Sequence, residues 1–269
     1  MEKHIFGTLA MALALSSCGG SGTQQTTEPN QVQEATYKTL KLQNGVNVSH
    51  WLSQSERRGA ERANQITKRD FDSIAAMGFD FVRLPVDEEH LYDKDLNRDG
   101  EGFQLMHNAI KWTLENGMNI VVDLHVVRSH HFNSENEHPN TLFQDPAEQE
   151  KIVKIWKDLQ KDLSQYPNDR LAYELMNEPI AHYFTDKIEE FYNALEPLYK
   201  RAVASIREVD QNHIILLGGG FWNSHFQMFK DWTFDDNIMY TCHRYGGDPT
   251  AEAIADYINH RDKTGLPMY

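Results

Sequence analysis

The stretch Asn119-Ile120-Val121-Val122-Asp123-Leu124 is almost continuously apolar. Such a run is typical of a β-strand that is covered on both faces, as the strands of a parallel sheet are. Helix signals flank it: Asn116-Gly117 predicts the end of a helix that begins near Gln104, and Asp145-Pro146-Ala147-Glu148 has the N-cap, the proline and the acid that open a helix. The centre of the chain is therefore predicted to run helix, strand, helix.

The same alternation extends in both directions. Further strands are expected at residues 46–48, 79–84, 171–175, 213–217 and 238–242, and further helices at 67–78, 187–209 and 251–263. Pro85 is expected to close the 79–84 strand, and Pro197 to kink the 187–209 helix or divide it in two. Pro267-Met268-Tyr269 has the pattern of the opening of a seventh strand.

Six strand–helix units fit either a parallel barrel or a doubly wound sheet. The barrel is favoured because no Gly-rich phosphate loop follows the first strand, whereas polar residues follow strand after strand. In a barrel, those strand ends converge on one mouth. We therefore expect a (β/α)8 TIM barrel of which about six βα units and the start of strand seven are present.

The net charge of the chain limits the kinds of ligand that we expect it to bind. The 269 residues contain 26 Lys plus Arg and 40 Asp plus Glu, a formal net charge of −14. A negative surface repels phosphate backbones and acidic polysaccharides, so we expect no nucleic-acid partner and a neutral ligand. We also expect a monomer.

The N-terminus has the pattern of an export signal. An apolar run from Ile5 to Leu15 is too short to span a bilayer, and Leu15-Ser16-Ser17-Cys18 resembles the lipobox of bacterial lipoproteins. This resemblance implies lipid on Cys18 and attachment to a bacterial membrane, at the cell surface or the periplasmic face. We expect a signal peptide over 1–17, a flexible tether over 18–35 and a barrel domain over 36–269.

Polar side chains at the predicted strand ends carry the candidate chemistry: Arg83, His125, Asn177, Glu178, Trp222, His243 and Tyr245. Leu175-Met176-Asn177-Glu178-Pro179 stands out, because an amide and a carboxylic acid end an apolar strand and a proline fixes the turn. With Val82-Arg83-Leu84-Pro85, Val122-Asp123-Leu124-His125 and His243-Arg244-Tyr245 in this order, the chain from about Lys41 to Tyr269 resembles the retaining β-glycanases of glycoside hydrolase family 5.

The chemistry of glycoside hydrolysis suits these residue types. A carboxylic acid protonates the glycosidic oxygen while a second carboxylate attacks the sugar. The resemblance implies that Glu178 is the general acid/base, that Asn177 binds the hydroxyl beside the reacting carbon and that Arg83 orients the nucleophile. It further implies that His125 and His243 donate to sugar hydroxyls, and that Tyr245 reaches the nucleophile. No cofactor or metal is implied.

Aromatic residues could support a sugar ring. Trp222 is the stronger candidate for such a platform, whereas Trp51 is a weaker one that could simply pack beneath the first loop. The family acts on several β-linked plant polysaccharides, and β-1,4-glucan is favoured on frequency alone.

The family nucleophile is a Glu on the seventh strand, which we expect beyond Tyr269; the 269 residues alone would then be inactive. Asp87, Glu88 and Glu89 lie near the mouth by position, and we expect them to be solvated acids at its rim.

Two other functions stay open. A lipid-anchored, non-catalytic glycan-binding protein would use the same aromatic residues without the acid. A metal-dependent barrel hydrolase would use a histidine-rich group: Asp123, His125, His130, His131 and His138.

Overall fold

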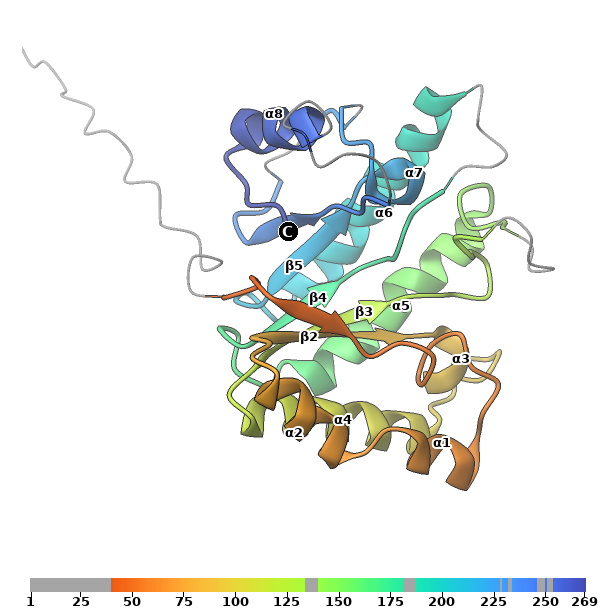
Figure 1. The fold of residues 1–269 in the computed structure, drawn as a ribbon. Coiled ribbons are helices and arrows are strands. Elements are labelled where there is room, and N and C mark those ends of the chain that lie inside the picture. The colour runs from red at the N-terminus through yellow and green to blue at the C-terminus, as the bar shows by residue number, and fades with distance from the viewer. Residues whose placement is uncertain are drawn as a thin grey trace, which may run out of the picture. The chain divides into compact units, whose positions relative to one another are not determined.

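The computed structural model describes residues 40–133, 140–180, 187–227, 229–231, 234–245, 250 and 254–269. Six strands form one parallel sheet in chain order: β1 (Gly45–Asn47), β2 (Phe81–Val86), β3 (Asn119–Leu124), β4 (Leu171–Glu174), β5 (Ile214–Gly218) and β6 (Ile238–Thr241). Eight helices are assigned in this part of the chain: α1 (Gly59–Gln65), α2 (Lys68–Ala76), α3 (Glu88–Leu91), α4 (Gly100–Glu115), α5 (Pro146–Leu163), α6 (Ile188–Arg207), α7 (Gly220–Asn223) and α8 (Ala255–Thr264). Figure 1 shows these elements.

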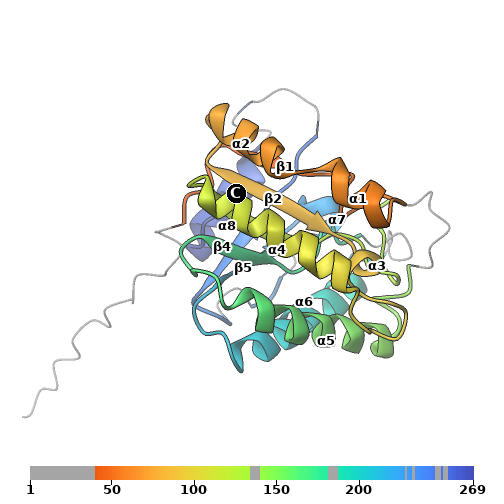
Figure 2. The ribbon, with the colours of Figure 1, turned by 90° about the horizontal axis from the view of Figure 1, so that it is seen from below.

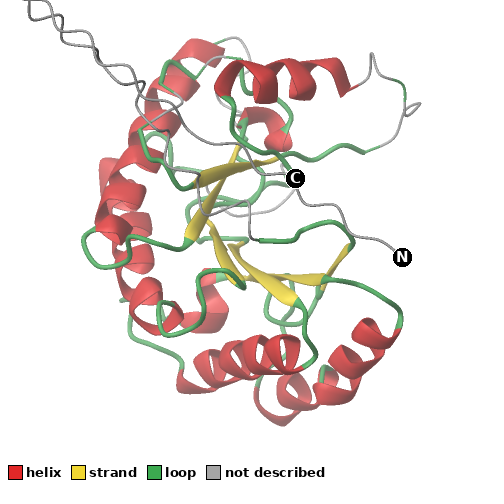
Figure 3. Cartoon of the chain, turned by 90° about the vertical axis from the view of Figure 1, so that its left-hand side faces the viewer, coloured by secondary structure: helices red, strands yellow, loops and turns green. Residues whose placement is uncertain are grey.

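The helices cover the outer side of the sheet. Figure 3 shows the strands inside an arc of helices, and Figure 2 shows α5 and α6 lying side by side. Their apolar faces, with residues such as Ile155, Leu159 and Phe191, pack in the main hydrophobic core against the sheet. A strand order that follows the chain, with helices outside, is the arrangement of a TIM barrel, so this part of the expected fold is confirmed.

A second apolar cluster lies on the inner side of the strands and includes Phe81, Val121 and Ala172. Side chains two residues apart along a strand point to the same face of a sheet. Arg83, Asp123 and Glu174 each follow one of those apolar residues by two positions, so the charged layer lies next to the apolar one, toward the carboxyl ends of the strands.

The predicted seventh strand begins where it was expected. Met268 forms a parallel bridge with Tyr240 of β6, and the backbone N–H of Tyr269 donates to the carbonyl of Tyr240 at 3.0 Å.

The prediction for Pro85 is wrong, and one of the two alternatives for Pro197 is excluded. Pro85 does not close the second strand but lies inside β2. The Val86 carbonyl accepts from His125, on the β3 side, so the nitrogen of Pro85 faces the β1 side. Because β1 pairs with β2 only as far as Asn47, the missing N–H of Pro85 breaks no ladder bond. Pro197 does not divide α6, which is assigned as one helix of 20 residues.

None of the helices in the described residues has the length and apolar character needed to cross a membrane.

Candidate active site

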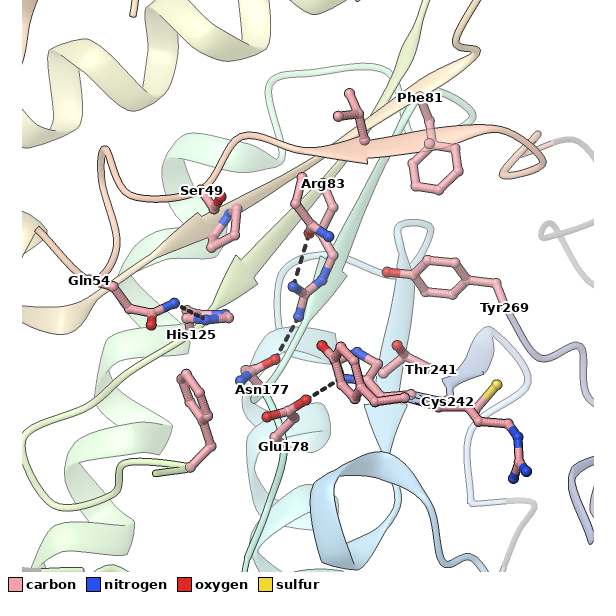
Figure 4. Close-up of a pocket in the computed structure, with 18 residues that line it drawn as sticks. Ser49, Gln54, Phe81, Arg83, His125, Asn177, Glu178, Thr241, Cys242 and Tyr269 are labelled. Atoms are coloured by element: carbon pink, nitrogen blue, oxygen red, sulfur yellow. Dashed lines mark hydrogen bonds and ion pairs between the residues drawn. The ribbon is translucent and has the colours of Figure 1, made fainter. Parts of the chain in front are cut away.

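A cavity of about 540 Å³ opens at the carboxyl ends of the strands (Figure 4). Six of the seven predicted site residues line it: Arg83, His125, Asn177, Glu178, His243 and Tyr245. Trp222, the seventh, lines an adjoining hollow of about 410 Å³, which Glu178 also borders. The side chains that the sequence places on separate strands therefore meet at one mouth.

Arg83 forms the floor of this cavity and is 7% exposed. Its Nε and Nη2 atoms bind the two carboxylate oxygens of Glu174 at 2.7 and 2.8 Å, and Nη2 also lies 2.8 Å from Asp123 Oδ2. Bidentate pairing of this kind fixes the plane of the guanidinium group. The position of Arg83 is therefore set before any substrate enters.

The two carboxyl groups beside Arg83 share one positive charge and respond differently. Burial raises the pKa of Asp123 well above its usual value, and the charge of Arg83 only partly opposes this. Burial also opposes ionisation of Glu174, but the Coulombic attraction and hydrogen bonds of Arg83 outweigh it and lower the pKa of Glu174. Of the two carboxyl groups, Glu174 is thus the one whose ionised form Arg83 favours more strongly.

Asn177 is held from two sides while one of its donors stays free. Its backbone N–H donates to the Leu124 carbonyl at 3.2 Å, and its side-chain oxygen accepts from Arg83 Nη2 at 3.0 Å. The side-chain nitrogen is buried and makes no hydrogen bond to any residue in the described part of the chain. Since unpaired buried donors are unfavourable, this nitrogen is suited to a hydroxyl that enters the cavity.

Glu178 lies beside Asn177 and is held by His243. The distance from His243 Nδ1 to Glu178 Oε1 is 2.7 Å, and Glu178 is 6% exposed. Its backbone φ of 45° lies in the left-handed region, which is unfavourable for a residue with a side chain. The turn after β4 therefore holds this carboxyl in a position that an ordinary strand end would not give.

His125 is fixed between Asp123 and Gln54. Its Nδ1 lies 2.7 Å from Asp123 Oδ2, and its Nε2 lies 3.1 Å from the side-chain nitrogen of Gln54 (Figure 4). Burial and the nearby positive charge of Arg83 lower the pKa of His125 to about 3. The ring is therefore neutral and serves as a hydrogen-bonding group rather than as an acid.

The aromatic residues considered as supports for a sugar ring differ in how exposed their side chains are. Trp222 is 42% exposed and Tyr245 is 84% exposed, so both present apolar surface to a ligand. Trp51 is fully buried, and its indole N–H donates to the Arg62 carbonyl at 2.8 Å. Trp51 is thus a packing residue beneath the first loop.

Two of the three acidic residues after β2 are buried, whereas the sequence predicted that all three are solvated. Asp87 and Glu88 are not solvated but 4% and 5% exposed. Glu88 is buried because Arg128 pairs with it at 2.5 Å, and Asp87 is buried beneath Gln54, whose backbone N–H it accepts at 2.6 Å. Only Glu89 lies at the rim, where it pairs with Arg58 at 3.1 Å.

Comparison with models of known protein families agrees with this fold and site. The model described as cellulase (glycosyl hydrolase family 5) matches residues 23–266. The chain belongs to glycosyl hydrolase family 5. It is 30% identical over 207 residues to Endoglucanase C of Acetivibrio thermocellus, an alignment that covers 75% of this chain. It is 28% identical over 232 residues to Endoglucanase 3 of Fibrobacter succinogenes, covering 81% of this chain.

The family-5 chain spans 57% of the length of Endoglucanase C and 33% of Endoglucanase 3. Among solved structures, endoglucanase Cel5A from Thermotoga maritima matches with a TM-score of 0.68 at 21% identity, over 87% of this chain and 80% of that one. A cellulose synthase subunit from Clostridioides difficile matches with a TM-score of 0.66 at 19% identity, over 85% of this chain and 79% of that one. These likenesses support the barrel fold.

The sequence did not point to Glu174 or Gln54 as residues of this site, and it gave Asp123 a role only in a candidate metal site. A charged residue within an apolar strand is the signal that could have found Glu174, since it must have a partner there. Gln54 lies in a loop and carries no such signal.

The histidine-rich group does not converge as a metal site within the described residues, where no three His, Cys, Asp or Glu side chains are placed to hold an ion. His130 is instead buried, and its Nε2 accepts from the backbone N–H of Ile180 at 3.3 Å. His138, like Cys18, lies outside the described residues.

Proposed function

We propose that this protein is a retaining, endo-acting β-glucanase in which Glu178 is the general acid and then the general base. One observation carries the proposal: among the described residues that line the cavity, Glu178 is the one carboxylate, and it lies beside His243 and Asn177, whose side-chain nitrogen has no partner among those residues. A polysaccharide substrate is also supported by the relatives, which bear endoglucanase names.

In the first step, the proton of Glu178 passes to the glycosidic oxygen as the bond from that oxygen to the anomeric carbon breaks. A second carboxylate forms a bond to the same carbon, which gives a glycosyl-enzyme. Glu178, now ionised, takes a proton from water as the water oxygen bonds to the anomeric carbon and the bond from that carbon to the second carboxylate breaks, which releases the sugar. The Nδ2 donor of Asn177 would bind the hydroxyl beside the reacting carbon throughout.

We place the second carboxylate on a seventh strand beyond Tyr269, where the family resemblance puts it. Two features support this position. Tyr269 already pairs with β6, and its hydroxyl donates to Glu174 at 3.1 Å, so the chain arrives beside Arg83. Asp123 and Glu174 are fully buried and paired with Arg83, which leaves neither available to attack a sugar.

We favour β-1,4-linked glucan as the substrate, with the exposed faces of Trp222 and Tyr245 as contacts for the chain. We further propose that the protein is exported as a monomer and is anchored to a bacterial membrane through lipid on Cys18.

Chemical rescue tests the proposed function. In the full-length protein, Glu178→Ala should reduce hydrolysis of glucan by roughly 10²- to 10⁴-fold. An aryl glycoside with an activated leaving group should be cleaved with less loss in the first step, and added azide should give a β-glycosyl azide. Glu89→Gln, which changes an exposed acid, is the matched control and should keep its activity. A protein truncated after Tyr269 that still hydrolyses glucan with retention would contradict the position given to the nucleophile.

A further inference from the structure

A short left-handed turn follows β5. Phe221, Trp222 and Asn223 of α7 have backbone φ angles of 52°, 57° and 58°. Left-handed backbone is unfavourable for residues with a side chain, although Asn and Asp adopt it more readily because their short polar side chains can hydrogen-bond locally. Trp222 is 42% exposed, whereas Asn223 is fully buried. The turn therefore exposes one side chain and buries the next.

Asn223 contacts His243 through both its backbone and its side chain. Its backbone carbonyl accepts the His243 N–H at 3.1 Å, and its side-chain nitrogen Nδ2 lies 3.4 Å from Nε2 of the His243 ring. The other ring nitrogen, Nδ1, lies 2.7 Å from Glu178 Oε1. His243 thus lies between Asn223 and Glu178, with one ring nitrogen facing each of them.

Gly218, the last residue of β5, sets the orientation of the Asn223 amide. A Cβ on Gly218 would lie 2.0 Å from Asn223 Oδ1, so in glycine a Cα hydrogen points at that oxygen. A C–H group is a weak hydrogen-bond partner for an oxygen, but it offers nothing to an amide N–H. The oxygen of the amide therefore lies against Gly218, and its nitrogen, a donor, faces the ring of His243.

A donor at Nε2 determines where the ring of His243 carries its proton. Neutral imidazole has one N–H group and one unprotonated nitrogen, which accepts. Because Asn223 Nδ2 donates to Nε2, the proton lies on Nδ1, and Nδ1 donates it to Glu178. A second proton on Nε2 would face the N–H groups of Asn223. The contact thus also opposes the imidazolium form.

We infer that Asn223 is a positioning residue that keeps the ring of His243 neutral, with its proton on Nδ1 and donated to Glu178. The role in catalysis rests on the proposed function, whereas the place of the His243 proton does not depend on it. A neutral donor can hold Glu178 in position while Glu178 gives up and regains a proton. An imidazolium at the same place would favour the carboxylate and would weaken the acid.

Asn223→Asp tests the inference, since aspartate has nearly the same shape and also adopts left-handed backbone. A carboxylate accepts from Nε2, so His243 in this variant should bind a second proton and become an imidazolium. Nitrogen NMR of the full-length protein with labelled histidine reads this directly. Near neutral pH, the Nε2 signal of His243 should be that of an unprotonated nitrogen in the unsubstituted protein and that of an N–H group in the variant. Its absence in His243→Gln assigns the signal.

The pH dependence of kcat/KM for glucan gives a second readout, which a purely structural role would not move. In Asn223→Asp, the limb that reports loss of the Glu178 proton should move to lower pH by about one pH unit or more. In a His243→Gln background the same substitution adds only a negative charge. That charge should move the limb to higher pH or not at all, so the two backgrounds differ in the sign of the effect.

The other titratable groups that face Glu178 and His243 are unchanged in every variant: Arg83, Asp123, His125, Glu174, Arg244, Tyr245 and Tyr257. A difference between the two backgrounds therefore reports the contact between position 223 and His243. Asn223→Gly is the second variant if the aspartate variant does not fold, because glycine favours this backbone and keeps the carbonyl that binds His243. It should shift the Nε2 signal toward that of an N–H group.

The outcomes separate the two proposals. An N–H signal at Nε2 in the unsubstituted protein, an Nε2 that stays unprotonated in Asn223→Asp, or a limb that moves to higher pH in that variant would overturn the inference. If Glu178→Ala keeps its activity on glucan while the Nε2 signals behave as expected, the proposed function fails, and only the place of the His243 proton stands.

Discussion

The indole N–H of Trp222 donates to the carbonyl oxygen of Phe132 at 2.9 Å, which joins the segment after β5 to the loop after β3. Phe132 lines the main cavity, Trp222 lines the adjoining hollow, and Glu178 borders both. One side chain therefore presents an exposed aromatic face beside the site and also secures the loop opposite.

These two roles of Trp222 can be separated by substitution. Trp222→Phe keeps an aromatic face but loses the hydrogen bond, so we expect the free energy of unfolding to fall by about 1 kcal/mol and oligosaccharide affinity to change little. Trp222→Ala loses both, and the dissociation constant should rise by roughly 5- to 30-fold, or about 1–2 kcal/mol. Calorimetric titration and urea unfolding measure the two effects. Equal binding losses in both variants would show that the loop contact, not the aromatic face, matters.

Two glycines in the first turn of α4 provide a stability test. A Cβ on Gly102 would lie 1.8 Å from the carbonyl oxygen of His90 in α3, whereas a Cβ on Gly100 would meet no atom within 4 Å. We therefore expect Gly102→Ala to destabilise the protein by about 1–3 kcal/mol, although alanine favours helices. Gly100→Ala should be neutral or stabilise it by up to about 1 kcal/mol. Thermal unfolding of the two variants gives the comparison, and a shift in the same direction for both would be inconsistent with the contact.

Asp210 is a buried acid at the end of the sheet away from the cavity, and it predicts that the free energy of unfolding depends on pH. Burial opposes ionisation of Asp210, but hydrogen bonds from His213 and Tyr173 outweigh it and hold its pKa well below the usual range. A depressed folded-state pKa stabilises the protein above the unfolded value of about 3.9, and this stabilisation is lost as the pH falls through and below that value.

Asp210→Asn should accordingly cost about 1–3 kcal/mol near pH 7, and the gap to the unsubstituted protein should narrow below about pH 4. Asp236→Asn, at an exposed position, is the control and should change little. Urea unfolding across this pH range provides the measurement, and a gap that does not vary with pH would contradict the assignment.

Chelation distinguishes the proposed chemistry from metal-dependent hydrolysis. Two carboxylates need no Lewis acid, so the full-length protein should hydrolyse glucan at the same rate in excess chelator. Inactivation that is reversed by added zinc would favour the histidine-rich group instead.

The proposed anchor has a simple test in cells. Two acyl chains give lasting membrane attachment, whereas one is marginal. With Cys18→Ala, the protein should lose its partition into the detergent phase and accumulate as a soluble or unprocessed form. Unchanged partitioning of this variant would rule out lipid on Cys18, and Cys242→Ala serves as the cysteine control.

The sequence predicted the order of strands well because most of the buried strands carry a short apolar run, as β3 does from Ile120 to Val122. It also singled out Arg83 and Glu178, which both line the cavity, although Arg83 lies inside β2 and not at the strand end where it was expected. It did not predict that Pro85 stays within a strand, since that depends on where the neighbouring strand stops. Burial of Asp87 and Glu88 was missed for a similar reason: it results from Gln54 and Arg128, which the fold brings in from other loops.

The left-handed backbone at Glu178 has a consequence for how this protein can be improved. Of seven non-glycine residues with positive φ in the described chain, six lie in the segments after β1, β4 and β5: His50, Gln54, Glu178, Phe221, Trp222 and Asn223. Strain of this kind costs on the order of 1–3 kcal/mol per residue, and glycine relieves it. Selection for heat resistance alone would thus favour substitution of these residues by glycine. The selected variants would be more stable but would lose the carboxyl group of Glu178 and the aromatic side chain of Trp222. Thermostable variants should therefore be screened for turnover at every round.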